Sequence, residues 1–310
     1  MQRGLLYSYS MLKVIVPTLN AAQDWPQFVS ALLLCVLPEQ VLIVDSESTD
    51  NTVVLARAEG FAVHSVARSE FNHGGTRQMA ADMFPDAEIL VYMTQDAVLA
   101  DANALTNLLA VFADPHVGAA YGRQLPKPEA GAIEAHARYF NYPATAEIRS
   151  LESRKRLGIK AIFISNSFSA YRRSALMEVG GFPVNAIFGE DTITAARLLL
   201  AGYKVAYAAE ARAYHSHSYS CTQEFKRYYD IGVLHNRESR ILGEFGQANG
   251  EGKRFVLSEL LYLWERDALQ IPAALTRTAA KLLGYRLGLL EPHFSPSIKR
   301  KLSMHPGFWT

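Results

Sequence analysis

The chain has 310 residues, of which 49% are hydrophobic and 20% are charged, and its formal net charge is +1. This length suits one large catalytic domain with an appendage, because single hydrophobic cores stop growing near about 250–300 residues. The balanced charge argues against a nucleic-acid binder. Two cysteines, Cys35 and Cys221, provide neither a disulfide framework nor a metal-ligand spacing, so a cytoplasmic location is expected.

Short β-branched runs alternate with helical segments from Met11 to about Tyr121. The predicted strands are Leu12–Pro17, Gln40–Asp45, Ala62–Val66, Glu88–Thr94 and Val117–Tyr121, and the predicted helices are Trp25–Leu37, Asn51–Glu59, Gly75–Phe84 and Ala102–Phe112. This alternation predicts an α/β fold with a mostly parallel sheet flanked by helices. Asp50 is expected to cap the start of the second helix, and Gly60 its end.

The pattern changes after residue 122. Residues 123–160 are rich in proline and charge, which predicts a long connection that is either functional or disordered. A strand at Ile162–Tyr171, a helix from Glu190 to about Leu200 and short strands at Lys204–Tyr207 and Ala211–Tyr214 are expected to follow. The pattern is helical beyond Cys221. We therefore expect a catalytic domain over residues 1–220 and a C-terminal helical region over residues 221–310.

Membrane signals are weak in this sequence. Residues 1–10 have no long apolar core and no small-residue cleavage site, so they do not predict a signal peptide. No run approaches the roughly 20 apolar residues that span a bilayer. Any membrane contact is expected at the inner surface of the cell membrane.

Polar clusters follow the first two predicted strands, at the edge where open α/β sheets bind nucleotides. The segment resembles the opening of the family 2 inverting glycosyltransferases, in which it holds the nucleotide of a sugar donor. The resemblance implies a GT-A fold. It also implies that Asp45 accepts a hydrogen bond from the pyrimidine or ribose and that Pro17 and Thr18 line the base pocket. Asn20 and Ser46 complete the expected nucleotide contacts, and a turn or capping role is the alternative for Ser46.

The apolar run Ile89–Met93 delivers Gln95 and Asp96 to the same edge. A sugar nucleotide needs its diphosphate neutralised, usually by a divalent metal on a carboxylate. The family has an Asp-X-Asp metal motif here, and Thr94 replaces its first Asp. Asp96 is therefore the expected ligand of Mg²⁺ or Mn²⁺, and Gln95 an expected donor contact. A capping role for Asp96 is the alternative.

Two histidines lie near the expected end of the catalytic core, in His215-Ser216-His217. The family often places a metal-ligating histidine here, and His217 is the preferred candidate. A lone histidine is more often structural. No spacing typical of a zinc hydrolase is present.

An acidic pair, Glu190-Asp191, opens a predicted helix. Such a pair is stabilised by the helix dipole without any catalytic purpose. In the family, however, an Asp of such a pair takes the proton of the acceptor hydroxyl. The resemblance assigns this role to Asp191 and an orienting or acceptor-binding role to Glu190. Adjacent residues do not share a helix face, so only one can act as the base.

The segment Phe71-Asn72-His73-Gly74-Gly75-Thr76-Arg77 places glycines and a cation before a helix, which suits a phosphate ligand. It resembles bacterial rhamnosyltransferases of the family, as do Gln95-Asp96-Ala97 and the ending Lys299–Trp309. The resemblance implies transfer of L-rhamnose from dTDP-β-L-rhamnose to a lipid-linked glycan of O-antigen or surface polysaccharide. Phe71, His73, Gly74 and Arg77 are expected donor contacts, and Phe71 and His73 are the first candidates to line the sugar pocket.

The tail from about Leu269 carries an excess of positive charge beside apolar residues at helical spacing. The basic residues are Arg277, Lys281, Arg286, Lys299, Arg300 and Lys301. An amphipathic basic helix can rest on anionic lipid. Packing on the catalytic domain or on a second subunit, as in a homodimer, is the alternative.

Three other functions are consistent with parts of this pattern. The nearest is the same reaction with a UDP-hexose donor. A nucleotidyltransferase is the second, although the segment after the first strand, Pro17 to Ala22, has neither the glycine nor the lysine of a phosphate loop. A non-catalytic sugar-nucleotide binder is the third.

Overall fold

The computed structural model describes residues 11–246 and 250–309, and the prediction about a signal peptide in residues 1–10 lies outside these ranges. Within them, nine strands form one sheet in the order β3-β2-β1-β4-β8-β6-β9-β5, with β7 paired to β9. The strands are β1 (Leu12–Thr18), β2 (Val41–Asp45), β3 (Ala62–Ser65), β4 (Ile89–Met93), β5 (Val98–Leu99), β6 (Val117–Leu125), β7 (Glu147–Arg149), β8 (Phe168–Arg172) and β9 (Lys204–Tyr214).

The sheet is mixed. Strands β1 to β4 pair in parallel, as the alternating sequence pattern predicts, while β8 enters antiparallel between β4 and β6. Strand β9 runs parallel to β6 as one strand with a register shift, where two short strands were expected. The predicted α/β fold class is confirmed. The sheet differs from the mostly parallel one that was expected in that β8 runs antiparallel to both of its neighbours.

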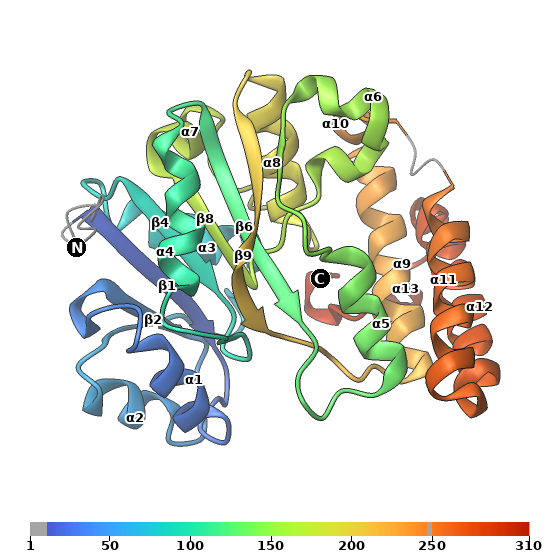
Figure 1. Cartoon of the computed structure of the whole chain (residues 1–310), viewed down its shortest axis with the longest axis horizontal. Helices are drawn as coiled ribbons and strands as arrows, with labels where there is room; N and C mark the ends of the chain where they lie inside the picture. The colour runs from blue at the N-terminus through green and yellow to red at the C-terminus, as the bar shows by residue number, and fades with distance from the viewer. Residues whose placement is uncertain (1–10, 247–249, 310) are drawn as a thin grey trace.

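Helices cover both faces of the sheet (Figure 1). The shorter ones are α1 (Trp25–Leu32), α2 (Thr52–Ala58), α3 (His73–Asp82), α4 (Ala104–Leu109), α5 (Ala132–Asn141), α6 (Arg154–Leu157), α7 (Arg173–Glu178) and α8 (Glu190–Leu200). Val14 and Val16 of β1 pack on the side of α1 and α4, while Ile15 packs on the side of α3 and α8. Because both faces are buried, the middle of β1, Val14–Val16, is a continuous apolar run.

Two predictions between residues 123 and 171 are wrong. The expected irregular connection contains α5, β7 and α6. His136 of α5 is buried against Phe255 and Tyr262, and this packing on a distant helix stabilises α5. The strand expected at Ile162–Tyr171 begins only at Phe168, because a 3-10 turn occupies residues 158–162.

The C-terminal end of α2 agrees with the sequence signals, whereas its N-cap lies one residue later than predicted. The carboxylate of Asp50 accepts a hydrogen bond from the backbone N–H of Thr52, although Asn51 is the N-cap residue. Gly60 follows the helix with a φ of +80°, a conformation that favours glycine.

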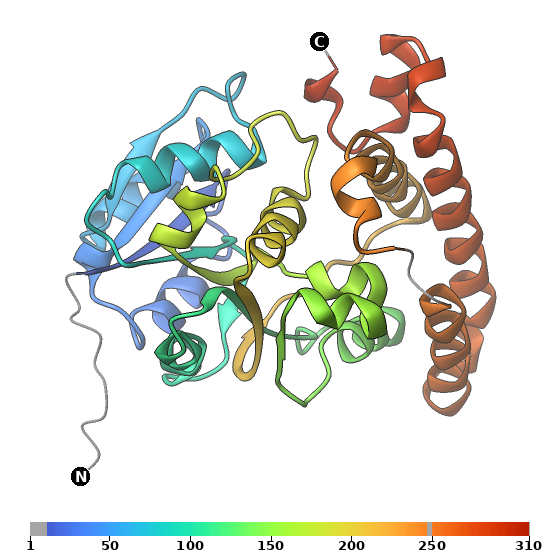
Figure 2. The same cartoon turned by 90° about the horizontal axis from the view of Figure 1, so that it is seen from above.

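The C-terminal helices form a layer beside the sheet (Figure 2). They are α9 (Cys221–Arg237), α10 (Ser239–Gly243), α11 (Glu251–Arg266), α12 (Ile271–Leu289) and α13 (Pro296–Leu302). Helices α9 and α12 approach closely at Gly288. A Cβ at this position would lie 2.1 Å from the carbonyl oxygen of Tyr229, so the approach requires glycine. In the described part of the chain, no helix is both long and apolar enough to cross a membrane.

Candidate active site

The first part of the site lies where β1 and β2 end side by side. Thr18 pairs in register with Asp45, and both side chains are buried. The Asp45 carboxylate accepts hydrogen bonds from the Thr18 hydroxyl at 3.3 Å and from the Ser48 backbone at 2.9 Å. The backbone N–H of Ser46 donates to the carbonyl of Thr18 at 2.9 Å. The predicted residues Pro17, Thr18, Asp45 and Ser46 therefore meet at one edge.

Asn20 and Gln95 hold the loops around this edge. The side-chain oxygen of Asn20 accepts from the backbone N–H of Thr49 at 2.8 Å. Gln95 bonds both backbone groups of Leu19, at 2.7 Å to its N–H and 3.1 Å to its carbonyl. The side chains of both predicted donor contacts are therefore engaged in shaping the loops.

Asp96, His215 and His217 form the second part of the site. One Asp96 carboxylate oxygen lies 3.4 Å from Nε2 of His215 and 3.6 Å from Nδ1 of His217. Nδ1 of His215 lies 2.9 Å from the side-chain oxygen of Gln124. Because an amide oxygen only accepts, Nδ1 of His215 donates to Gln124, and Nε2 is the ring atom that faces Asp96.

The donor set fits a divalent metal ion. One ligand atom from each residue lies within 4.8 Å of the others. Burial, and then the neighbouring His215, lowers the pKa of His217 to about 4, so the ring is neutral near pH 7. Burial opposes ionisation of Asp96, but the hydrogen bond and charge of His215 hold the pKa of this carboxyl well below its usual range. A carboxylate with two imidazoles suits Mn²⁺ or a similar ion.

Of these two histidines, only His217 was predicted from the sequence as a metal ligand. His215 is buried and His217 is half-buried, and their rings lie 4.5 Å apart. The strand β9 ends at Tyr214, so both residues lie in the turn that follows and are not held to alternate faces of the sheet. Gln124 of β6 was not predicted, because no local motif marks a residue that orients a ligand.

Glu190 and Asp191 form the third part of the site, at the start of α8. The Glu190 carboxylate is buried, 3.1 Å from a guanidinium nitrogen of Arg77 and 2.9 Å from the amide nitrogen of Asn166. Asp191 accepts from the backbone N–H groups of Asn166 at 3.2 Å and of Thr192 at 2.7 Å. Asn166, which sequence analysis missed, therefore contacts both carboxylates.

The two carboxylates differ in protonation. Burial would raise the pKa of Glu190, but Arg77 and then His73 lower it below its usual value. Burial, and then the negative charge of Glu190, raises the pKa of Asp191 to about 7. Glu190 is thus a fixed anion, while Asp191 can gain and release a proton near neutral pH.

The glycine-rich segment packs against the acidic pair. Arg77 is buried, and its guanidinium contacts Glu190 and the carbonyl of His73, so it is not directed at open solvent as an exposed phosphate-binding cation would be. Gly74 is required for packing, because a Cβ there would lie 1.8 Å from the carbonyl oxygen of Pro183. The rings of Phe71 and His73 meet edge to face at 5.4 Å.

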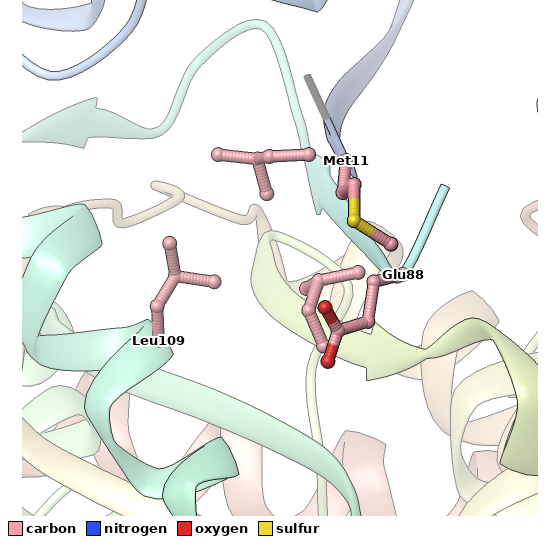
Figure 3. A pocket seen from close by; sticks show the side chains of 5 residues that line it. Met11, Glu88 and Leu109 are labelled. Atoms are coloured by element: carbon pink, nitrogen blue, oxygen red, sulfur yellow. The ribbon is translucent and has the colours of Figure 1, made fainter. Parts of the chain in front are cut away.

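A small cavity lies at the other edge of the sheet (Figure 3). It is lined by Met11, Leu12, Glu88, Ile89 and Leu109. Leu12 and Ile89 begin β1 and β4, whose opposite ends carry the site residues. The cavity is therefore not part of the candidate active site.

A model of glycosyl transferase family 2 matches residues 13–180. The chain is 43% identical over 300 residues to the O-antigen chain rhamnosyltransferase RfbN of Salmonella typhimurium strain LT2, covering 96% of both chains. It is 44% identical over 298 residues to the O-antigen chain rhamnosyltransferase WbaN of Salmonella anatum, covering 96% of this chain and 95% of that one.

Solved structures share the fold at low identity. The mannosyltransferase PcManGT of Pyrobaculum calidifontis, solved with GDP-Man and Mn²⁺, aligns with a TM-score of 0.55 at 20% identity, over 96% of this chain and 84% of that chain. S. aureus TarS 1-349 aligns with a TM-score of 0.53 at 17% identity, over 91% of each chain. The GT-A fold is thereby confirmed, and the family match and the two relatives establish that this chain belongs to glycosyltransferase family 2.

Proposed function

We propose that this enzyme transfers L-rhamnose from dTDP-β-L-rhamnose to a hydroxyl of a lipid-linked glycan during O-antigen or related polysaccharide assembly. The observation that carries this proposal is the similarity, over nearly the full chain, to two O-antigen chain rhamnosyltransferases. Family membership favours sugar transfer over the alternatives of nucleotidyl transfer and simple binding.

Asp191 is the proposed general base. Its raised pKa suits a group that accepts the proton of an acceptor hydroxyl near neutral pH. The hydroxyl oxygen then attacks the anomeric carbon from the face opposite the diphosphate, which inverts the configuration from β to α. Glu190 and Asn166 hold Asp191 in place, and Arg77 keeps Glu190 ionised.

The sheet edge is the proposed donor site. Pro17, Thr18, Asp45 and Ser46 would contact the nucleotide, while Asn20 and Gln95 shape the loops around it. A Mg²⁺ or Mn²⁺ ion would be held by Asp96, His217 and His215. When bound, it supplies positive charge for the leaving diphosphate. Phe71 and His73 would line the sugar pocket.

We propose that residues 221–310 form a helical region that contacts the membrane. In this region the outer faces of α11 and α12 would rest on an anionic membrane surface. Leu257, Leu261 and Trp264 of α11 are 61%, 68% and 74% exposed. Leu275, Leu282 and Leu283 of α12, and Leu290 at its C-cap, are also exposed. The two helices form the α11–α12 face, at the side of the molecule remote from β1 and β2 (Figures 1 and 2). Such a patch on a protein surface marks an interaction site.

Charge favours lipid over a second copy as the occupant of this face. Exposed Lys253 and Arg286 flank the leucines, and α12 contains no acidic residue. A twofold dimer that pairs α12 with α12 would bring the basic residues of this helix together, whereas anionic headgroups complement them. Part of the predicted basic tail is used internally, since Lys281 pairs with Glu224 and Lys299 with Glu291. A lipid-linked acceptor would bring the enzyme to the inner face of the cell membrane.

Calorimetry tests the proposed donor. dTDP-rhamnose, dTDP-glucose and UDP-glucose are titrated with and without Mn²⁺ into the native enzyme and Asp96→Ala. We expect a metal-dependent preference for dTDP-rhamnose that the substitution removes. Preference for UDP-glucose would retain the family and replace the donor, and binding of none of the three would refute the proposed substrate.

A further inference from the structure

The C-terminal turn, residues 303–309, lies against the candidate active site. The ring of His305 meets the ring of His73 edge to face at a centroid distance of 5.0 Å. It also stacks on the ring of Phe188, at a centroid distance of 6.0 Å with an interplanar angle of 21°. Phe188 precedes Gly189 and the Glu190-Asp191 pair, so His305 reaches the site from more than a hundred residues away in sequence.

The turn is held firmly in this position. The buried Asp230 carboxylate of α9 accepts from the backbone N–H of Met304 at 2.8 Å, and the Ser303 hydroxyl accepts from the N–H of His305 at 2.8 Å. Trp309 is buried in a cluster with Ile187, Tyr229 and Val233. The turn is therefore anchored both to α9 and to the segment that leads into the acidic pair.

The two imidazoles keep their polar atoms available. Within residues 11–246 and 250–309, no protein group hydrogen-bonds to the ring nitrogens of His73 or His305. Burial, and then the nearby His73, lowers the pKa of His305 to about 4, so its ring is neutral and can both donate and accept. Such ring nitrogens suit the hydroxyl groups of a sugar ring, which both donate and accept hydrogen bonds.

We propose that His305 is a substrate-binding residue, and that the C-terminal turn and His73 together hold a pyranose ring beside Glu190-Asp191. The ring is either the sugar of the donor or the terminal sugar of the acceptor. This inference rests on the proposed glycosyl transfer and adds to the site a residue from the helical region. The fold thereby makes activity depend on a correctly packed C-terminus.

The test compares His305→Ala, His305→Phe and His305→Gln with His293→Ala, a control on an exposed histidine of the same region. Binding of dTDP and of the dTDP-sugar is measured by calorimetry, and the KM for the acceptor and kcat are measured separately. Thermal unfolding shows whether each variant retains the native stability.

In His305→Ala we expect sugar binding to weaken about fivefold to tenfold, seen either in the affinity for the dTDP-sugar or in the KM for the acceptor. This is the size of one lost hydrogen bond. If the affinity for the dTDP-sugar falls and that for dTDP does not, His305 binds the sugar of the donor. If the KM for the acceptor rises while donor binding is unchanged, His305 binds the terminal sugar of the acceptor. His305→Gln should recover part of the loss and His305→Phe should not. Native behaviour of all three variants would overturn this inference, whereas a native enzyme without transfer activity would instead refute the proposed function.

Discussion

A guanidinium nitrogen of Arg77 lies 3.1 Å from a carboxylate oxygen of Glu190, and both side chains are 6% exposed. This ion pair joins α3 to the first turn of α8 and keeps Glu190 charged although it is buried. Burial, and then the fixed charge of Glu190, raises the pKa of the adjacent Asp191. One buried pair therefore influences both the packing and the chemistry of the site.

Arg77→Met should destabilise the enzyme by about 3–5 kcal/mol, because it leaves the Glu190 carboxylate buried without its cation. The double variant Arg77→Met/Glu190→Gln should regain most of this loss, since it removes both charges. Urea unfolding measures the free energies. A loss below about 1 kcal/mol in the single variant would contradict a structural role for the pair.

The transfer rate should rise with pH through about 7, because Asp191 must be ionised to accept a proton. Glu190→Gln should move this rise to lower pH, since removal of the neighbouring negative charge lowers the pKa of Asp191. Asp191→Asn should reduce kcat by about 10²–10⁴-fold. The pH dependence of kcat/KM at saturating metal is the measurement, and an identical profile in Glu190→Gln would disprove the coupling.

Ionisation of Asp191 should also affect stability. Its pKa is raised from 3.8 to about 7 in the folded state, so the stabilisation is complete below pH 3.8 and is lost as pH rises through 7. Asp191→Asn should show a smaller decline in the free energy of unfolding over this interval. Denaturant titrations at several pH values between 4 and 8 test this, and equal slopes in the two proteins would count against it.

Gln124→Ala should weaken Mn²⁺ binding by about 10–100-fold, because it removes the group that orients His215. Gln124 itself donates no metal ligand, so a loss would report on orientation. His116→Ala, an exposed histidine elsewhere, is the control. Calorimetry with Mn²⁺ alone measures the affinity for the metal without relying on activity. Native affinity in Gln124→Ala would show that Gln124 does not orient His215 for metal binding.

Leu261→Ser/Trp264→Ser should abolish binding to vesicles that contain anionic lipid, because both apolar groups project from the α11–α12 face. Leu34→Ser/Val54→Ser removes comparably exposed apolar groups from the turn after α1 and from α2, and should bind as the native enzyme does. Cosedimentation with anionic and neutral vesicles provides the readout. A dimer that the first double variant dissociates would instead identify a second copy as the occupant.

Gly74→Ala should destabilise the enzyme by about 1–3 kcal/mol or more, because the new methyl group would overlap the carbonyl of Pro183. Gly243→Ala, where a Cβ meets no atom within 4 Å, should be neutral or stabilising. Thermal unfolding of the two variants compares them directly. Equal stability would show that the turn around Pro183 can yield.

Local sequence signals predicted much of the site. Strands β1, β2 and β4 are apolar runs that end in polar turns, and parallel strands place those ends at one edge. The positions of Thr18, Asp45 and Asp96 follow from that rule. Long-range packing was not predictable in the same way: α5 is stabilised by His136 against Phe255, and nothing near residue 136 signals that contact.

The sequence by itself determined the α/β class, the edge that carries the polar residues and the acidic pair at the start of α8, because these depend on periodicity and on spacing along the chain. Only the tertiary structure decided that Arg77 faces Glu190, that both His215 and His217 reach Asp96, and that His305 lies beside His73. Each of these relationships joins residues far apart in sequence. Burial and charge act through space, so they are fixed only when the chain has folded.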